Sequence, residues 1–261
     1  MTAFTPYLST QIAFGVLIGV VLLLVSRMTL RRQAHSQFPT AGRMFAVWWG
    51  SLGVAWWVWA GDTLLVGSGA SGSVAGLIDY MLVAVYFVFI FVAFASLFYY
   101  LLFLFVGSPR LSWAVWLLYG AIAVVLAGLL ALADPPWDGH VTGLNGDAIF
   151  GAYTNVADVL GVVFIVPVII AALSLFFVVR RAEDHAQRYR ILLLSTSLAF
   201  YLLMPLFFDS NPGIQPDGTA AWVREILNKV GLLAAVAAVV LAYRPPAWVA
   251  KRIGARTQKG P

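Results

Sequence analysis

The sequence predicts an all-α membrane protein, a seven-transmembrane helix bundle with its N-terminus outside and its C-terminus in the cytoplasm. The first observation is compositional: 62% of the 261 residues are hydrophobic, 10% are charged, and the mean hydropathy is +0.90. A soluble domain has roughly a quarter of its residues charged, so this chain cannot cover a surface that faces water. The other two observations are repeated apolar stretches of spanning length and basic residues on alternate connections.

The apolar stretches define the expected helices in order. A helix needs about 20 apolar residues to cross the hydrocarbon core of a bilayer. Seven stretches meet this length, roughly 8–26, 44–66, 77–106, 111–133, 150–179, 191–209 and 219–243. Turn-forming residues separate several of them, among others Gly67-Ser68-Gly69, Gly107-Ser108-Pro109 and Asn211-Pro212-Gly213. We therefore expect one seven-helix domain over residues 1–243 and a basic cytoplasmic tail over residues 244–261.

The positions of the basic residues predict the orientation. Most of the 16 Lys and Arg residues lie in the connections after the first, third and fifth stretches and in the tail. Because cytoplasmic loops are enriched in Lys and Arg, this predicts that the N-terminus is outside and the C-terminus is cytoplasmic. We expect a multi-pass protein of a prokaryotic cytoplasmic (inner) membrane. The opposite connections carry Asp134, Asp138, Asp147, Asp209 and Asp217. The net charge of +5 then indicates contact with anionic lipid headgroups of the bilayer and no nucleic acid partner.

The residue types that most enzymes need are scarce. The chain has no cysteine, which excludes disulfides, thiolate metal sites and a cysteine nucleophile. His35, His140 and His185 share no predicted helical face, so haem ligation and a histidine-based zinc site are disfavoured. Since no embedded histidine accompanies the Ser and Thr residues, no nucleophile and base can be assembled. We predict no catalytic residue, no metal and no resident cofactor, and we do not expect an enzyme.

Ionisable residues inside the apolar stretches are the candidate functional residues, because a charge in hydrocarbon costs free energy. Asp62 ends the second stretch, Asp79 begins the third, and Asp158 lies early in the fifth. Glu225 and Lys229 lie four residues apart in the seventh, a spacing that suits an ion pair. In the predicted orientation all of them fall in the outer half of the membrane, whereas the inner halves of the third and fifth stretches carry no charge. This asymmetry favours a site that opens outward over a pathway through the membrane.

Simpler interpretations exist for the same residues. Asp62, Asp79 and Arg224 can lie at the level of the lipid headgroups, where a charge costs little. Glu225 and Lys229 can form a structural pair that helps their helix to pack.

Two tryptophans extend the candidate site. Trp56 and Trp59 lie one helical turn apart, and Asp62 follows a further turn along. Together they can form an aromatic wall with a carboxylate at its rim, which suits a flat or cationic ligand. The alternative is an aromatic belt at the membrane interface. That interpretation applies first to the tryptophans near the ends of other stretches, which are Trp48, Trp49, Trp113, Trp116 and Trp222.

One segment of the seventh stretch resembles the microbial rhodopsins. Glu225-Ile226-Leu227-Asn228-Lys229-Val230-Gly231 is similar to that family's acidic residue, lysine and Val-Gly pattern. The resemblance implies that Lys229 carries retinal as a Schiff base and that Glu225 belongs to its counterion. Pro205 and Asp79-Tyr80 are looser parallels to the retinal-lining and third helices of the family. Because no carboxylate lies in the inner half, the resemblance implies a sensor more than a proton pump.

A broader resemblance links the chain to the seven-helix sensory modules of bacterial histidine kinases and related signalling proteins. It rests on the aromatic third stretch running into Gly107-Ser108-Pro109-Arg110, on Gln187-Arg188-Tyr189-Arg190-Ile191-Leu192, and on Tyr243-Arg244-Pro245-Pro246-Ala247-Trp248. It implies a receptor-like or sensory protein that signals through a cytoplasmic or membrane protein partner, with the basic tail from Trp248 to Lys259 as one contact.

These observations lead to one expectation and two alternatives. We expect a small-molecule or lipophilic ligand to bind toward the outer face, near Trp56, Trp59, Asp62, Asp79, Asp158, Glu225 and Lys229. The first alternative is a retinal-binding photoreceptor that uses Lys229 and Glu225. The second is an accessory or structural subunit of a larger membrane complex, in which the charged pair docks a neighbouring helix.

Overall fold

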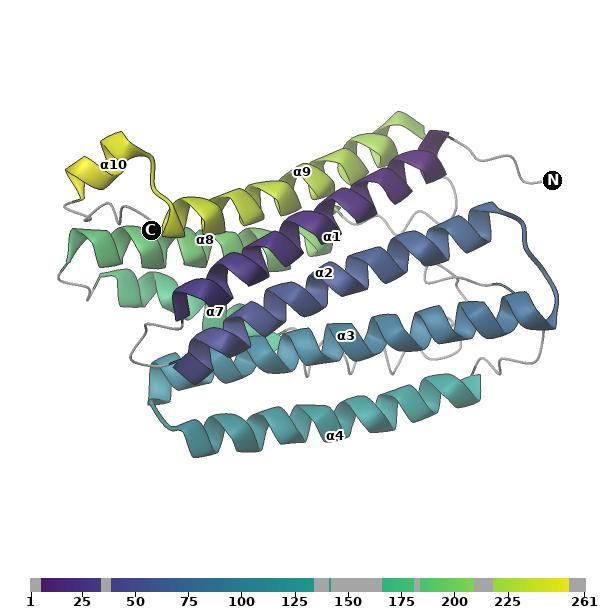
Figure 1. Ribbon diagram of the computed structural model, residues 1–261, viewed down its shortest axis with the longest axis horizontal. Helices are drawn as coiled ribbons and strands as arrows, with labels where there is room; N and C mark the ends of the chain where they lie inside the picture. Colours follow the sequence, from purple (N-terminus) through teal and green to yellow (C-terminus); the bar gives the residue numbers. More distant parts are fainter. Residues whose placement is uncertain are drawn as a thin grey trace. The chain divides into compact units, whose positions relative to one another are not determined.

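The computed structural model describes residues 6–33, 39–133, 141, 166–180, 184–208 and 218–253. Within these ranges the chain forms α-helices and short connections, and no β-strand occurs there, which confirms the predicted all-α class for this part of the chain. The helices (Figure 1) are α1 (Pro6–Gln33), α2 (Pro39–Gly67), α3 (Ser73–Val106), α4 (Pro109–Ala133), α7 (Val166–Val179), α8 (His185–Phe208), α9 (Gly218–Tyr243) and α10 (Ala247–Arg252).

Three of the described helices are long and apolar enough to cross a membrane. The segments are Leu8–Arg32 in α1, Ser73–Val106 in α3 and Ile226–Tyr243 in α9, and a shorter apolar segment, Pro109–Val125, lies in α4. These helices support the prediction of a membrane protein, but they number three and not the predicted seven. Tryptophan, glycine and serine lower the hydropathy of α2, and most of the fifth predicted stretch lies outside the described residues.

The chain divides into two compact units, which are described separately. The first unit comprises residues 1–166 and 211–222, and the second comprises residues 167–210 and 223–261. In the first unit α1 packs against α2, α2 against α3, and α3 against α4. Short connections make these consecutive helices antiparallel (Figure 1). The second unit contains α7, α8, most of α9, and α10.

Glycine ends α3 and allows the chain to turn into α4. Gly107 has a φ of 71° in the left-handed region, and its N–H donates to the Phe103 carbonyl oxygen at 2.9 Å. A residue without a Cβ adopts this conformation without strain, which is why glycine is common at helix C-termini. Pro109 then begins α4, at a position where its missing N–H leaves no helical hydrogen bond unmade.

Glycines also bring α1 and α2 into close contact. An ideal Cβ added to Gly19 lies 2.8 Å from the Gly53 carbonyl oxygen, and one added to Gly53 lies 2.9 Å from the Gly19 carbonyl oxygen. Nearer the C-terminus of α1, the Ser26 hydroxyl donates to the Ala46 carbonyl oxygen at 2.7 Å. Small residues four apart, here Gly15 and Gly19, let two helix backbones approach closely and gain van der Waals contact inside a membrane.

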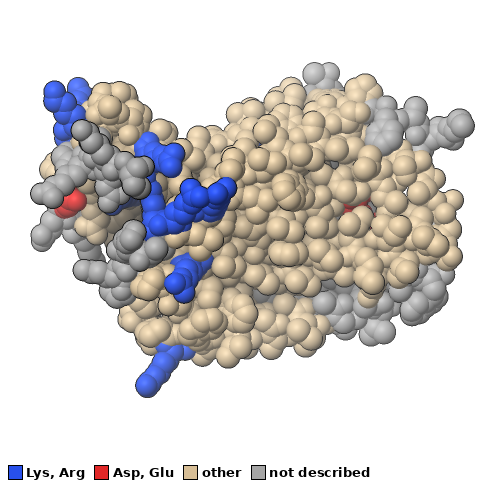
Figure 2. Space-filling view, viewed as in Figure 1, with Lys and Arg blue, Asp and Glu red and all other residues tan. Residues whose placement is uncertain are grey.

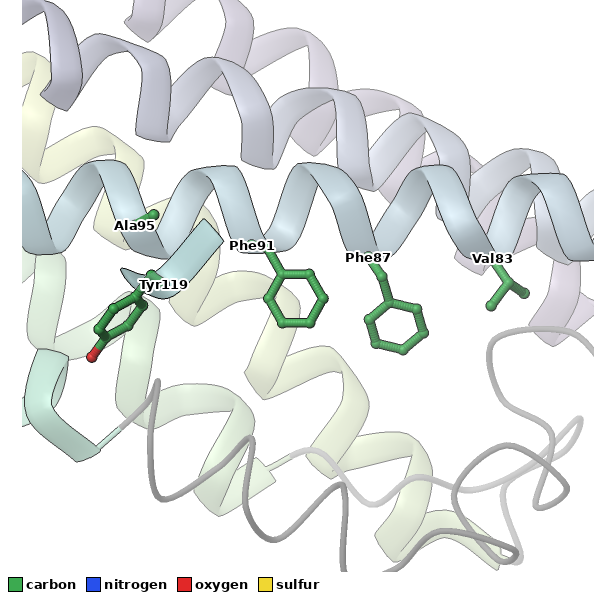
Figure 3. Close-up of a cluster of buried hydrophobic side chains, with 5 residues drawn as sticks. All are labelled: Val83, Phe87, Phe91, Ala95 and Tyr119. Atoms are coloured by element: carbon green, nitrogen blue, oxygen red, sulfur yellow. The ribbon is translucent and has the colours of Figure 1, made fainter. Parts of the chain in front are cut away.

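Apolar residues of α3 form a packed cluster with α4. Four side chains spaced four residues apart along α3 and a tyrosine of α4 make up the cluster, and Val83, Phe87 and Phe91 point the same way (Figure 3); its members are Val83, Phe87, Phe91, Ala95 and Tyr119. The Tyr119 ring also stacks on the ring of Phe98, with centroids 5.1 Å apart. Since α3 packs against both α2 and α4, its aromatic residues act in packing.

Trp48 and Trp49 are buried in protein, and neither ring is exposed to lipid. Both side chains are 0% exposed, their ring centroids are 4.0 Å apart, and nearby Phe45 stacks on Tyr100 of α3 at 4.6 Å. The interpretation of these two residues as part of an interfacial belt is therefore wrong. The reason is that α2 has α1 on one side and α3 on the other, so its aromatic side chains fill the space between helices. Trp113, 40% exposed, remains compatible with a belt.

Candidate functional site

The two buried aspartates among the described residues of the first unit lie toward one end of it, with a buried glutamine and a buried threonine. Buried serine and threonine hydroxyls also occur elsewhere along these helices. Asp62 of α2 and Asp79 of α3 are each 1% exposed, and Thr63 of α2 and Gln11 of α1 are each 3% exposed. Three consecutive helices therefore contribute polar side chains to the interior. We call these four residues the polar layer.

The contacts between α1 and α2 place Gln11 beside the rest of the polar layer. Gly19 lies against Gly53, and a Cβ added to Gly15 lies 3.0 Å from the Cβ of Ala60. In an antiparallel pair, each further turn toward the start of α1 matches one further turn toward the end of α2. Gln11 is one turn beyond Gly15, so it lies level with the two α2 residues of the polar layer.

Asp62 and Asp79 lie at similar heights on adjacent helices. A Cβ added to Gly61, the neighbour of Asp62, lies 4.0 Å from Leu82 Cδ2 on α3. Leu82 is three residues from Asp79, which corresponds to a rise of about 5 Å along the helix axis. Each aspartate takes part in a hydrogen bond or an electrostatic interaction. The two carboxylates are thus within about one helical turn of each other in height.

The burial of the two aspartates corrects one interpretation of the sequence. A carboxylate removed from water loses hydration, and it is kept charged only if protein groups compensate. Asp62 and Asp79 are each 1% exposed, so neither carboxylate has the contact with water or headgroups that this interpretation requires. Arg224, the third residue in that interpretation, has a side chain that lies outside the described part of the structure.

The predicted tryptophan pair adjoins the polar layer. The rings of Trp56 and Trp59 meet edge to face, with centroids 5.4 Å apart and an interplanar angle of 75°. Trp59 packs against the α3–α4 cluster, and a Cβ added to Gly15 of α1 would lie 3.2 Å from its ring. The Thr63 hydroxyl donates to the Trp59 carbonyl oxygen at 2.8 Å. Asp62 follows Trp59 by three residues, so α2 carries the aromatic pair and a buried carboxylate in adjacent turns.

The opposite end of the first unit carries exposed cations. Arg27 and Arg31 lie near the end of α1, Arg43 near the start of α2, and Arg110 at the start of α4, and all four are exposed (Figure 2). Between Asp79 and Arg110 the sequence holds no charged residue. The described helices of this unit therefore separate their charges, with buried acids toward one end and exposed cations at the other.

The second unit contains a buried lysine. Lys229 of α9 is 4% exposed and its neighbour Asn228 is 3% exposed. Lys229 takes part in a hydrogen bond or an electrostatic interaction. The side chain of Glu225 and the whole of Asp158 lie outside the described residues, so the ion pair of Glu225 with Lys229 stays a prediction.

Two parts of this arrangement were not predicted from the sequence. The first is Gln11, although an amide inside the first apolar stretch is a visible signal. The second is the Gly15-x-x-x-Gly19 spacing, which marks a helix that packs closely against another in a membrane. Thr63 gave no distinct signal, because threonine side chains inside helices commonly bond to their own backbone.

No protein-family model matches the chain, and no curated protein or solved structure is detectably similar to it. Among the residues that the structure describes, no group of three or more His, Asp or Glu side chains could hold a metal ion. The resemblances to rhodopsins and to sensory modules therefore stay predictions, and functional inference depends on the geometry above.

Proposed function

We propose that this protein is a receptor-like, sensory membrane protein whose ligand is recognised at the polar layer of the first unit. The observation that carries the proposal is the burial of two carboxylates, Asp62 and Asp79, each 1% exposed, beside a tryptophan pair. The proposal includes seven spans in a prokaryotic cytoplasmic membrane, with the N-terminus outside and the C-terminus in the cytoplasm. With exposed arginines facing the cytoplasm, the polar layer lies toward the outside.

The chemistry of these residues defines the class of ligand. Carboxylates favour a cation, and aromatic rings add apolar contact and attract a cation to their faces. A small cationic ligand, or a flat lipophilic one with a cationic group, suits Asp62, Asp79, Trp56 and Trp59. Asp158 belongs to the proposed set by its position in the sequence and lies outside the described residues.

Signalling requires that the ligand interact differently with two arrangements of the helices. A ligand that takes over the interactions of the buried aspartates stabilises one packing of α1, α2 and α3 over another, which shifts the population between them. The tight contact at Gly19 and Gly53 couples the packing of α1 to that of α2. A partner protein on the cytoplasmic side reads the change.

We propose that Lys229 and Glu225 of α9, in the second unit, form a second polar pair that contributes to ligand binding. Two observations support it: Lys229 is 4% exposed, and the two residues are four apart, a spacing that suits an ion pair. A buried lysine is retained in an apolar helix only where other groups stabilise its charge or where it reacts.

The test is ligand binding by purified protein in lipid nanodiscs, with a panel of small cationic and lipophilic compounds. The Asp62→Asn/Asp79→Asn double variant should bind about 10- to 100-fold more weakly, because a hydrogen bond to a charged group contributes about 1.5–3 kcal/mol. Asp184→Asn is the matched control, since this exposed carboxylate accepts a hydrogen bond from the Ala186 N–H at 3.1 Å, as an asparagine can. Equal binding by the double variant and wild type would refute the site, and unchanged binding by Glu225→Ala/Lys229→Ala would refute the second polar pair.

The burial of Lys229 also favours a second candidate function, a retinal-binding photoreceptor. A Schiff-base lysine must be shielded from water, and Lys229 meets this condition at 4% exposed. Absorbance spectra before and after addition of all-trans retinal test it, with Lys229→Ala and the exposed Lys251→Ala as a pair of variants. A visible band in wild type and Lys251→Ala, absent in Lys229→Ala, would establish the Schiff base. The absence of any band would remove this candidate.

A further inference from the structure

The short helix α10 follows directly after an apolar helix of spanning length. The spanning segment of α9 ends at Tyr243, and α10 begins at Ala247 after Arg244, Pro245 and Pro246. Four residue steps reach at most about 14 Å. The headgroup layer is about 5–8 Å thick on each side of a bilayer, and a helix is about 10–12 Å wide. If α9 spans the membrane, α10 is therefore held at the headgroup layer.

The residues of α10 divide into two faces. At 100° per residue, Trp248 lies between Lys251 and Arg252 around the helix, and Ala250 lies on the other side. Trp248 is 68% exposed, and Lys251 and Arg252 are also exposed. Ala250 is 2% exposed. One face of α10 is thus covered, and the other presents a tryptophan flanked by two cations.

We propose that the exposed face of α10, formed by Trp248, Lys251 and Arg252, binds the surface of an anionic lipid bilayer. Tryptophan is enriched at membrane interfaces because its ring is apolar and its N–H is polar. Lysine and arginine near an anionic surface are attracted to the headgroups. The tryptophan ring of this face inserts among the lipids, and its two cations complement the charge of anionic headgroups. The face lies at the level of those headgroups. This inference is independent of the ligand and the retinal proposals.

The absence of cysteine from the chain allows the test to be made on the full-length protein. A fluorescent probe sensitive to polarity is attached to Ala247→Cys, an exposed position at the start of α10, and the protein is placed in nanodiscs. The discs contain neutral phosphatidylcholine alone or a mixture with phosphatidylglycerol, each with a nitroxide-labelled lipid as quencher. The reference probe is Ser71→Cys, an exposed position in the connection between α2 and α3 with no neighbouring Lys or Arg.

The Ala247→Cys probe should be quenched by labelled lipid and emit at shorter wavelength, and both effects should increase with phosphatidylglycerol. The Ser71→Cys probe should show no such dependence on lipid charge. Adding Lys251→Gln/Arg252→Gln should lower the surface association constant about 30-fold, since each cation contributes about a fivefold factor. Trp248→Ala should reduce quenching in both lipid compositions.

Three outcomes would overturn the proposal. One is equal quenching of the Ala247→Cys probe in neutral and anionic discs. Another is a dependence on lipid charge that survives Lys251→Gln/Arg252→Gln. The third is protection of the probe from both labelled lipid and an aqueous quencher, which would show that a protein surface covers α10.

Discussion

The two ends of the α1–α4 unit both concentrate charge, but they place it in opposite environments. At one end Arg27, Arg31, Arg43 and Arg110 are exposed, and toward the other the carboxylates of the polar layer are 1% exposed. Exposed arginines need no protein partner, because water or lipid headgroups stabilise them. Buried carboxylates need protein groups around them, and the close packing of α1 and α2 at their glycines helps to exclude water. The exposed charges therefore indicate orientation, and the buried ones indicate a site.

A substitution that pushes α1 away from α2 should lower the free energy of unfolding the most. In Gly19→Ala the new Cβ would lie 2.8 Å from the Gly53 carbonyl oxygen, closer than real Cβ atoms approach, so the helices must move apart. We expect the free energy of unfolding to fall by about 1–3 kcal/mol. Chemical denaturation of the protein in detergent or lipid nanodiscs measures the change.

Gly120→Ala is the matched control for Gly19→Ala. Gly120 also lies inside an apolar helix, but nothing lies within 4 Å of a Cβ added there. Because alanine is a better helix former than glycine, this variant should be unchanged or more stable by about 0.5–1 kcal/mol. Equal destabilisation by the two substitutions would contradict the assignment of Gly19 to a close helix contact.

Neutralising one buried carboxylate should lower the free energy of unfolding by up to the same amount as Gly19→Ala does. Asp79→Asn keeps the shape of the side chain, but it replaces an acceptor oxygen with an amide donor in a buried position. Leaving buried polar groups without suitable partners costs about 1–3 kcal/mol, and Asp62→Asn should behave in the same way. Thermal or chemical unfolding, with the exposed Asp184→Asn beside it, measures the difference. A loss no larger than that of Asp184→Asn would show that burial at this end has no energetic consequence.

Removing an exposed arginine should have the smallest effect. Arg27→Gln and Arg31→Gln each change a side chain that solvent or lipid headgroups surround, so stability should change by no more than about 0.5 kcal/mol. The same unfolding measurement applies. A loss of stability as large as that of Asp79→Asn would show that exposed and buried charges do not differ in their contribution to stability.

The sequence predicts where the helices of this protein lie along the chain better than it predicts which helices and side chains contact one another. Apolar stretches and turn residues locate the helices because both signals are local. The burial of Trp48 and Trp49 could not be predicted in this way, because a tryptophan near a helix end looks the same whether it faces lipid or another helix. The inclusion of Gln11 in the polar layer depends on the register between α1 and α2, which the glycine contacts set and which no single stretch reveals.

The proposed function depends on one claim above all, that the polar layer faces outward and the arginine end faces the cytoplasm. The two ends of α2 test it, since the chain has no cysteine and Thr40 and Ser71 are exposed positions near the start and just after the end of that helix. Single-cysteine variants at these positions are treated with a membrane-impermeant maleimide in right-side-out membrane vesicles. The account predicts that Ser71→Cys is labelled at once and Thr40→Cys only after the vesicles are permeabilised. Labelling of Thr40→Cys in sealed vesicles, with Ser71→Cys protected, would reverse the orientation and contradict an outward-facing ligand site.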